Sequence, residues 1–126
     1  MLEEITVTAD SEEPGALAQI GELLGAAGVN IETLSAFAFN GTGVVHLVVD
    51  DGDDAAEVLR KNGLRVESSR PILTATLDDR PGELGRFCRK LAKAGVDIEA
   101  AYIVRRGGGE TELIFAVDDL EAAQDA

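Results

Sequence analysis

The sequence predicts an α+β protein made of two copies of one small unit. Residues 14–32 read PGALAQIGELLGAAGVNIE, and residues 81–99 read PGELGRFCRKLAKAGVDIE. The two segments align without a gap at a spacing of 67 residues (81 − 14), and nine of the 19 aligned positions are identical. A repeat of this length indicates one supersecondary unit used twice. The strand and helix patterns around both segments follow the same order.

The first unit opens with a strand and a helix. Residues 5–9 alternate between apolar and polar side chains, as a half-buried strand does. A polar turn at residues 10–13 leads to Pro14, which we expect at the first helical position because its fixed φ suits that place. The helix then carries an apolar stripe at steps of three and four residues, formed by Leu17, Ile20, Leu24 and Ala27. Gly28 is expected to end this helix with a positive φ.

The remainder of the first unit reads as strand, strand, helix and strand. The strands are predicted at residues 29–39, 44–49 and 64–69, with a hairpin turn at 40–43 and a helix at 53–61. The complete order, βαββαβ, is that of a ferredoxin-like sandwich, in which both helices cover one face of an antiparallel sheet.

The second unit repeats this order and then stops early. A strand at residues 73–77 precedes a helix from Arg80 or Pro81 to Ala94, and Gly95 ends it. Strands follow at 96–105 and 111–117. The apolar stripe of the helix uses the same four slots, Leu84, Phe87, Leu91 and Ala94.

The predicted units span residues 1–70 and 71–126, and the second unit lacks its last strand. Residues 118–126 suffice for about two turns of helix and leave nothing for a fourth strand. The first strand of the second unit would then have a bare edge, and bare edges invite pairing. We expect residues 64–77 to run from the first sheet into the second. As an alternative, another subunit completes the edge.

Charge and composition exclude several functions. The net charge is −13, and only five residues are aromatic. Nucleic-acid binders need a basic surface or stacking platforms, so neither DNA nor RNA is an expected partner. The sequence has no apolar run of membrane-spanning length, and its single cysteine, Cys88, excludes an internal disulfide. A cytoplasmic location without membrane contact is expected, in either a halophilic host or an ordinary one.

Two repeated motifs resemble those of the ACT domain, a small-molecule regulatory module with a ferredoxin-like fold. The residues 79–84 (DRPGEL) and 95–98 (GVDI) resemble its turn and its second-strand step, and so do 12–17 (EEPGAL) and 28–31 (GVNI). The resemblance covers nearly the whole chain and implies a tandem ACT protein without catalytic residues, metal or cofactor. It also implies that an amino acid binds where two units meet.

The resemblance places the ligand between the strand-to-helix turn of one unit and the second strand of its neighbour. The candidate residues in the first unit are Glu12, Glu13, Pro14, Gly15, Ala16, Leu17, Asn30 and Ile31. Those in the second unit are Asp79, Arg80, Pro81, Gly82, Glu83, Leu84, Asp97 and Ile98.

The chemistry of these residues fits a zwitterion. A helix N-terminus presents unpaired N–H groups to a carboxylate, and Gly15 and Gly82 let a ligand approach the backbone closely. The amide of Asn30 donates to a carboxylate and accepts from an ammonium group, whereas Asp97 repels a carboxylate. We therefore predict two unequal sites. The better one combines Asn30 with the Pro81–Gly82 turn, where Arg80 adds a positive charge.

Each of these features also has a purely structural interpretation. A Pro-Gly pair often just starts a helix, and Asn30 and Asp97 sit where side chains can satisfy backbone groups at a strand start. The lone His46 and Cys88 are expected to be structural. The glycines at 107–109 join two strands and open no helix, so a phosphate loop is excluded.

The leading functional hypothesis is a non-enzymatic regulatory module that binds an amino acid and acts on a partner enzyme or regulator. The runner-up is an interaction subunit that docks a partner enzyme and has vestigial ligand sites. A small enzyme that hydrolyses acyl phosphates is disfavoured, because no nucleophile and base stand together in the sequence. A homodimer is expected, since the second unit is incomplete.

Overall fold

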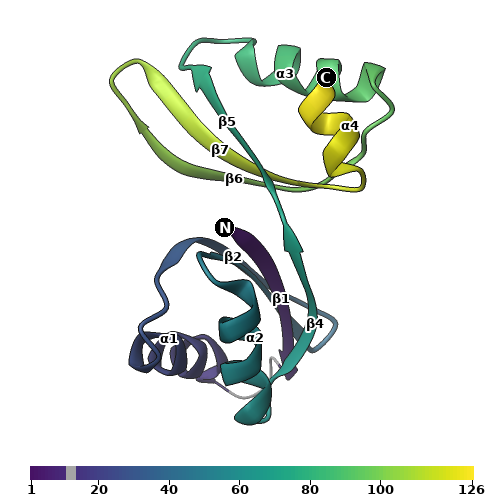
Figure 1. Cartoon of the computed structure of the whole chain (residues 1–126). Coiled ribbons are helices and arrows are strands. Elements are labelled where there is room, and N and C mark those ends of the chain that lie inside the picture. The colour runs from purple at the N-terminus through teal and green to yellow at the C-terminus, as the bar shows by residue number, and fades with distance from the viewer. Residues whose placement is uncertain (11–13) are drawn as a thin grey trace. The chain divides into compact units, whose positions relative to one another are not determined.

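Two compact units make up the computed structural model, Met1–Arg70 and Pro71–Ala126. The structure describes residues 1–10 and 14–126. In each unit the helices cover one face of an antiparallel sheet, which confirms the predicted α+β class (Figure 1). None of the helices in the described part of the chain is long and apolar enough to cross a membrane.

Unit 1 is a complete βαββαβ sandwich. Its elements are β1 Glu3–Asp10, α1 Ala16–Ala26, β2 Ile31–Phe39, β3 Thr42–Val49, α2 Gly52–Lys61 and β4 Arg65–Pro71. The sheet has the order β2-β3-β1-β4. Ile5 and Leu47 on the sheet and Ile20, Leu24 and Leu59 on the helices are fully buried in one core. This core fixes which face of each strand points inward.

Unit 2 has the same layout without a fourth strand. Its elements are β5 Leu73–Asp78, α3 Glu83–Lys93, β6 Ile98–Gly107, β7 Glu110–Val117 and α4 Leu120–Asp125. The three strands have the order β5-β7-β6, which confirms that the last strand is missing. Phe115 is fully buried at the centre of the core, and its ring stacks on that of Phe87 at 5.1 Å between centroids.

One continuous segment belongs to both sheets, as expected. β4 ends at Pro71 in the first sheet and β5 begins at Leu73 in the second, so a single residue, Ile72, separates the two strands. β5 therefore holds the position in unit 2 that β1 holds in unit 1, next to the central strand of the hairpin.

The prediction that proline opens each helix is wrong. Gly15 and Gly82 are the N-caps of α1 and α3, with φ values of 111° and 90°. A residue in this left-handed conformation cannot continue a helix, so both helices start one residue after the glycine. At the second turn the Glu83 N–H donates to the Arg80 carbonyl at 3.3 Å. This bond and the ψ of −14° at Gly82 are those of a type II β-turn, with Pro81 in its favoured second place.

The later start also changes the apolar stripes. Leu17 and Leu84 fall in the first turn of their helices and stay 42% and 53% exposed. The last members, Ala27 and Ala94, are exposed C-cap residues. Only the middle of each stripe reaches the core, so the apolar residues beside both Pro-Gly turns remain accessible.

The helix ends are as predicted. Gly28 and Gly95 follow the C-caps with φ values of 75° and 78°. After α3 the Val96 N–H donates to the Leu91 carbonyl and the Gly95 N–H to the Ala92 carbonyl, both at 3.0 Å. These two bonds define a Schellman motif, in which glycine takes the left-handed position.

Gly52 is expected to be the least replaceable helical glycine of unit 1. A Cβ built there would lie 2.8 Å from the Glu3 Cβ and 2.8 Å from the Ser69 Oγ. Gly52→Ala should therefore lower the free energy of unfolding by about 1–3 kcal/mol through overpacking. Gly25→Ala is the control, because its Cβ meets nothing within 4 Å. It should raise stability by about 0.5–1 kcal/mol, and urea unfolding followed by circular dichroism compares the two variants. Equal effects would contradict the crowding at Gly52.

Candidate functional site

The two Pro-Gly turns lead into α1 and α3, and within the described residues neither helix has a side-chain cap at its N-terminus. Neither Gly15 nor Gly82 has a side chain to accept from the first-turn N–H groups of α1 and α3. By contrast, Asp51 and Asp119 cap α2 and α4 through their carboxylates. A helix N-terminus with free donors attracts anions. Within the described residues, the first-turn N–H groups of α1 and α3 therefore lack the side-chain acceptor that α2 and α4 have.

In unit 2 this turn borders a small pocket of about 100 Å³. One wall comes from the end of β5 and the start of α3, and the other from the β6–β7 hairpin. The lining consists of Leu77, Asp78, Asp79, Arg80, Glu83, Leu84, Ile103, Arg106, Thr111 and Leu113. Its volume equals that of about three water molecules, so it suits a small group rather than a large ligand.

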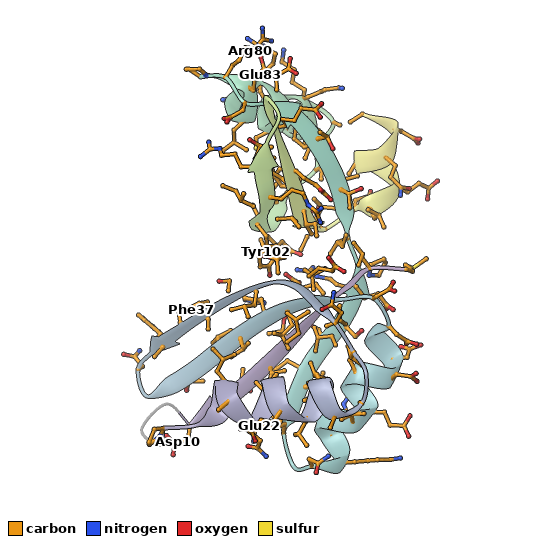
Figure 2. The ribbon with its side chains drawn as sticks, turned by 90° about the vertical axis from the view of Figure 1, so that its left-hand side faces the viewer. Asp10, Glu22, Phe37, Arg80, Glu83 and Tyr102 are labelled. Atoms are coloured by element: carbon orange, nitrogen blue, oxygen red, sulfur yellow. The ribbon has the colours of Figure 1, made fainter. Side chains whose placement is uncertain are left out.

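The lining of the pocket combines charged and apolar side chains. Arg80 donates to Asp78 at 3.1 Å and to Glu83 at 3.0 Å, and Figure 2 shows Arg80 and Glu83 together at the start of α3. Across the pocket, Arg106 donates to Asp79 at 3.1 Å. Both arginines of the lining are thus paired with carboxylates. A ligand carboxylate would have to compete for them, whereas an ammonium group would find acceptors at once.

Glu83 is held in its charged form. A hydrogen bond from Arg86 lowers the pKa of this carboxyl group, partial burial opposes the shift, and the charges of Arg86 and Arg80 lower it further. Because the pKa of Glu83 is depressed in the folded state, the interaction stabilises the fold at pH values above the ordinary pKa range of a glutamate. That contribution is lost as the pH falls through the lowered pKa.

Unit 1 repeats the turn with different neighbours. Pro14 and Gly15 precede α1, with Ala16 and Leu17 in its first turn, whereas Glu12 and Glu13 lie outside the described residues. A hollow of about 640 Å³ lies at the end of β1, beside the β2–β3 hairpin tip and residues 63–65. None of the described residues that line this hollow belongs to the predicted set.

Asn30 and Asp97 stand at the other predicted position, just before β2 and β6. Asn30 donates from Nδ2 to a Glu32 carboxylate oxygen at 3.3 Å and does not cap a backbone group there. Asp97 is tied through its backbone, since its N–H donates to the Asp118 carboxylate at 2.8 Å. Ile31 and Ile98 begin the strands and pack against the two cores.

No single unit brings the turn and the second-strand residues together. In the register of unit 1, Ile31 and Glu3 both pair with Val49, whereas Asp10, which precedes the turn, pairs with Thr42 at the far end of β3. The turn after β1 and the start of β2 are therefore separated by the length of β1, which is roughly 20 Å at the rise per residue of a strand. The same holds in unit 2, where Ile98 pairs with Val117 and Asp78 with Glu110.

Sequence reasoning missed the second wall of the pocket. Ile103, Arg106, Thr111 and Leu113 follow the turn by 20 residues or more and reach it only through the β6–β7 hairpin. The one available signal was the Arg105–Arg106 pair before the glycine turn. The structure separates these two arginines, since Arg105 pairs with Glu112 at 3.1 Å and Arg106 with Asp79.

His46 lies on β3 and contacts Thr6 and Phe37. Its Nδ1 lies 3.0 Å from the Thr6 Oγ1, and its ring lies 6.2 Å from that of Phe37. Among residues 1–10 and 14–126 there is no cluster of three or more potential metal ligands. Cys88 is half-buried on α3 and packs against the core of unit 2.

The fold matches known structures over nearly its full length. A protein from Bacteroides thetaiotaomicron has a TM-score of 0.84 at 19% identity, over 98% of this chain and 83% of that one. The ligand-free regulatory subunit of aspartate kinase from Thermus thermophilus has a TM-score of 0.73 at 17% identity, over 98% and 89%. The corresponding subunit from Thermus flavus has a TM-score of 0.67 at 17% identity, over 98% and 88%. No curated protein sequence matches the chain.

Two ferredoxin-like units in tandem, each with a glycine N-cap after a Pro-Gly turn, define the class of fold to which the chain belongs. The family model described as an ACT domain pair matches residues 2–126. The chain therefore belongs to the ACT domain pair family.

Proposed function

We propose that this ACT pair is a non-enzymatic regulatory module that binds a free amino acid, or a similar small metabolite, where two ACT units meet. The uncapped helix N-terminus beside the pocket of unit 2 supports this function most directly. Its N–H groups suit an α-carboxylate, Asp78 and Asp79 suit an α-ammonium group, and Leu77 and Ile103 suit an apolar side chain.

The separation of the two motifs supports a ligand shared between units. The turn and the Asn30 or Asp97 position lie at opposite ends of each sheet, so one small ligand can touch both only by contacting two units. Such a ligand has different contacts when the units are together and when they are apart. This difference is what a ligand needs in order to shift an equilibrium between two states.

The pocket lining also supports a binding role over catalysis. Among its described residues are arginines, carboxylates, one threonine and apolar side chains, with no serine, cysteine or histidine to act as nucleophile or base. Two of the similar structures are regulatory subunits of aspartate kinase. By analogy, this chain would act on a partner enzyme or regulator rather than on a substrate.

The function is tested by thermal unfolding of the full chain with each proteinogenic amino acid in turn, at low and high salt. A ligand that binds only the folded state raises the free energy of unfolding by about 2.7 kcal/mol at a concentration of 100 Kd. One amino acid, or a few related ones, should raise the melting temperature selectively. If none does, the protein is not an amino-acid sensor.

Asn30 and Asp97 are expected to contribute unequally. Asn30→Ala should weaken binding of the stabilising amino acid about tenfold or more, because it removes a donor and an acceptor for the zwitterion. Asp97→Ala should have a smaller effect, since the carboxylate repels the ligand's own carboxylate. Isothermal titration calorimetry on both variants measures the difference, and equal losses would contradict two unequal sites.

A second candidate function has its own support. Arg80 and Arg106 are already paired with carboxylates, and Leu84 and Ile103 are more than half exposed. Such a surface also suits an interaction subunit that docks a partner enzyme and no longer binds a metabolite. This function predicts no thermal shift with any amino acid.

A further inference from the structure

Basic side chains are concentrated on one helix of an otherwise acidic chain. α3, Glu83–Lys93, carries four of the 11 lysines and arginines and only one carboxylate, so its own charge is +3. Because the whole chain carries −13, the other residues together carry −16 (−13 − 3). We call the four basic residues of this helix the basic stripe: Arg86, Arg89, Lys90 and Lys93.

The basic stripe lies on the side of α3 that faces away from the core. Phe87, Cys88 and Leu91 belong to the core of unit 2 or pack against it. All four stripe residues are exposed, and α3 covers the sheet with its other side (Figure 1). At 3.6 residues per turn, the four side chains fall within one arc of about 100°.

Most of the positive charge on this stripe is uncompensated. Within the described residues, only Arg86 of the stripe has an ion pair, which it forms with Glu83. Arg89, Lys90 and Lys93 have none. Elsewhere the pattern is the opposite, because ion pairs with carboxylates are formed by Lys61, Arg70, Arg80, Arg105 and Arg106.

The internal repeat shows that the fold does not require this stripe. α1 has the same place in unit 1, and at the spacing of 67 residues the stripe positions correspond to Gln19, Glu22, Leu23 and Ala26. None of these four is basic. The helix dipole favours cations in the last turn, where Lys90 and Lys93 lie, but its effect fades beyond that turn. Arg86 and Arg89 therefore need another explanation.

We propose that the basic stripe docks an acidic segment of a partner protein, one that presents three or four carboxylates along about two helical turns. From Arg86 to Lys93 the stripe is about 10 Å long at the rise of an α-helix. Guanidinium and ammonium groups only donate hydrogen bonds, so carboxylates are their natural acceptors. The inference rests on the proposed regulatory function, since it gives the partner of that function a place to bind. It does not require a bound amino acid.

The charge distribution favours a short acidic segment over a nucleic acid or an anionic membrane. The Debye length is about 10 Å at 0.1 M salt, so a segment on the stripe interacts mainly with α3. A duplex or a bilayer extends further and also meets the residues that carry −16. The stripe has no aromatic side chain on which a base could stack. Beside it, the exposed Gly85 and Ala92 are small, so a partner backbone has room to approach.

The docking is tested by titrating the full chain with a synthetic acidic peptide, followed by backbone amide NMR without any amino acid present. The peptide has about three helical turns, with glutamates spaced three and four residues apart on one face. The amide signals of α3 should shift on addition of this peptide, and they should stay in place with an analogue in which every glutamate is glutamine. Raising the salt from about 0.1 M to about 0.5 M should weaken the binding, because salt screens ion pairs.

Two triple variants with the same net charge show whether the stripe itself is responsible. Glutamine has nearly the helix propensity of lysine and arginine, so α3 should stay folded when its three unpaired cations are neutralised. The dissociation constant should rise at least about tenfold in this stripe variant, which combines Arg89→Gln, Lys90→Gln and Lys93→Gln. The control removes three exposed cations elsewhere and should bind as the wild type does: it combines Lys61→Gln, Arg65→Gln and Arg105→Gln.

Several results would overturn the proposal. They are an absence of shifts in α3, equal losses in the two triple variants, or tighter binding of a short DNA duplex or of phosphatidylserine vesicles than of the peptide. Shifts of α3 that depend on protein concentration without the peptide would make a second copy the occupant instead. The outcome is separate from that of the amino-acid test. A chain that binds the peptide but is stabilised by no amino acid keeps the docking surface and loses the sensor function.

Discussion

Gly82→Ala should abolish most of the stabilisation that the bound amino acid provides. Gly82 has a φ of 90°, and a Cβ there would meet nothing within 4 Å, so the substitution acts through the backbone rather than through a clash. An alanine in this conformation is strained by about 1–2 kcal/mol. The backbone is expected to relieve this strain by rotating, which points the first N–H groups of α3 away from the pocket. We expect binding at least about tenfold weaker, measured by calorimetry with the amino acid that stabilises the wild type.

Gly85→Ala is the matched control on the same helix. Gly85 lies within α3, its φ is not in the left-handed region, and its Cβ would also meet nothing within 4 Å. The substitution should raise helix stability by about 0.5–1 kcal/mol and leave binding unchanged. If Gly82→Ala binds as tightly as Gly85→Ala, the Pro-Gly turn only starts the helix and is not part of a ligand site.

Phe115→Ala should unfold unit 2. The ring is fully buried between β7 and α3, and a phenylalanine-to-alanine change in a core costs about 3–5 kcal/mol. A unit of this size with a three-stranded sheet has little more stability than that to lose. Unit 1 has its own core and should stay folded. Tyr102, the only tyrosine of the chain, lies on β6 and reports on unit 2 by its fluorescence (Figure 2).

Phe115→Leu controls for the chemistry of the substitution. Leucine keeps most of the volume, so unit 2 should stay folded with a loss of about 1–1.5 kcal/mol. Backbone amide NMR spectra distinguish the units, because the signals of β1–β3 should persist in Phe115→Ala while those of β5–β7 collapse. Loss of both sets together would show that the two units unfold as one.

The sequence alone predicted much of the fold because its signals are local. The repeat at a spacing of 67 residues, the alternation in the strands and the glycines after the helices depend on backbone conformation within a few residues. The same signals misplaced the helix starts. A proline before a glycine suits either a first helical turn or a type II β-turn, and the left-handed φ of Gly82 decided for the β-turn.

The candidate site was only half visible in the sequence. Residues 79–84 are adjacent in the chain, so their motif could be read directly. Four of these six residues line the pocket, namely Asp79, Arg80, Glu83 and Leu84. Ile103, Arg106 and Leu113 come from the hairpin, where nothing in the local sequence connects them to the turn. They reach the pocket only because of the strand register. A slip of one residue would move these side chains to the other face of the sheet.

What the sequence by itself determined is therefore the unit: its duplication, its order of elements, its glycine-ended helices and the missing last strand. Only the tertiary structure decided which carboxylates hold Arg80 and Arg106, which apolar residues beside the turns stay exposed, and that the turn and Asn30 lie at opposite ends of one sheet. The physical reason is that backbone preferences act over a few residues. The pairing of strands and the burial of side chains join residues that are far apart in the chain.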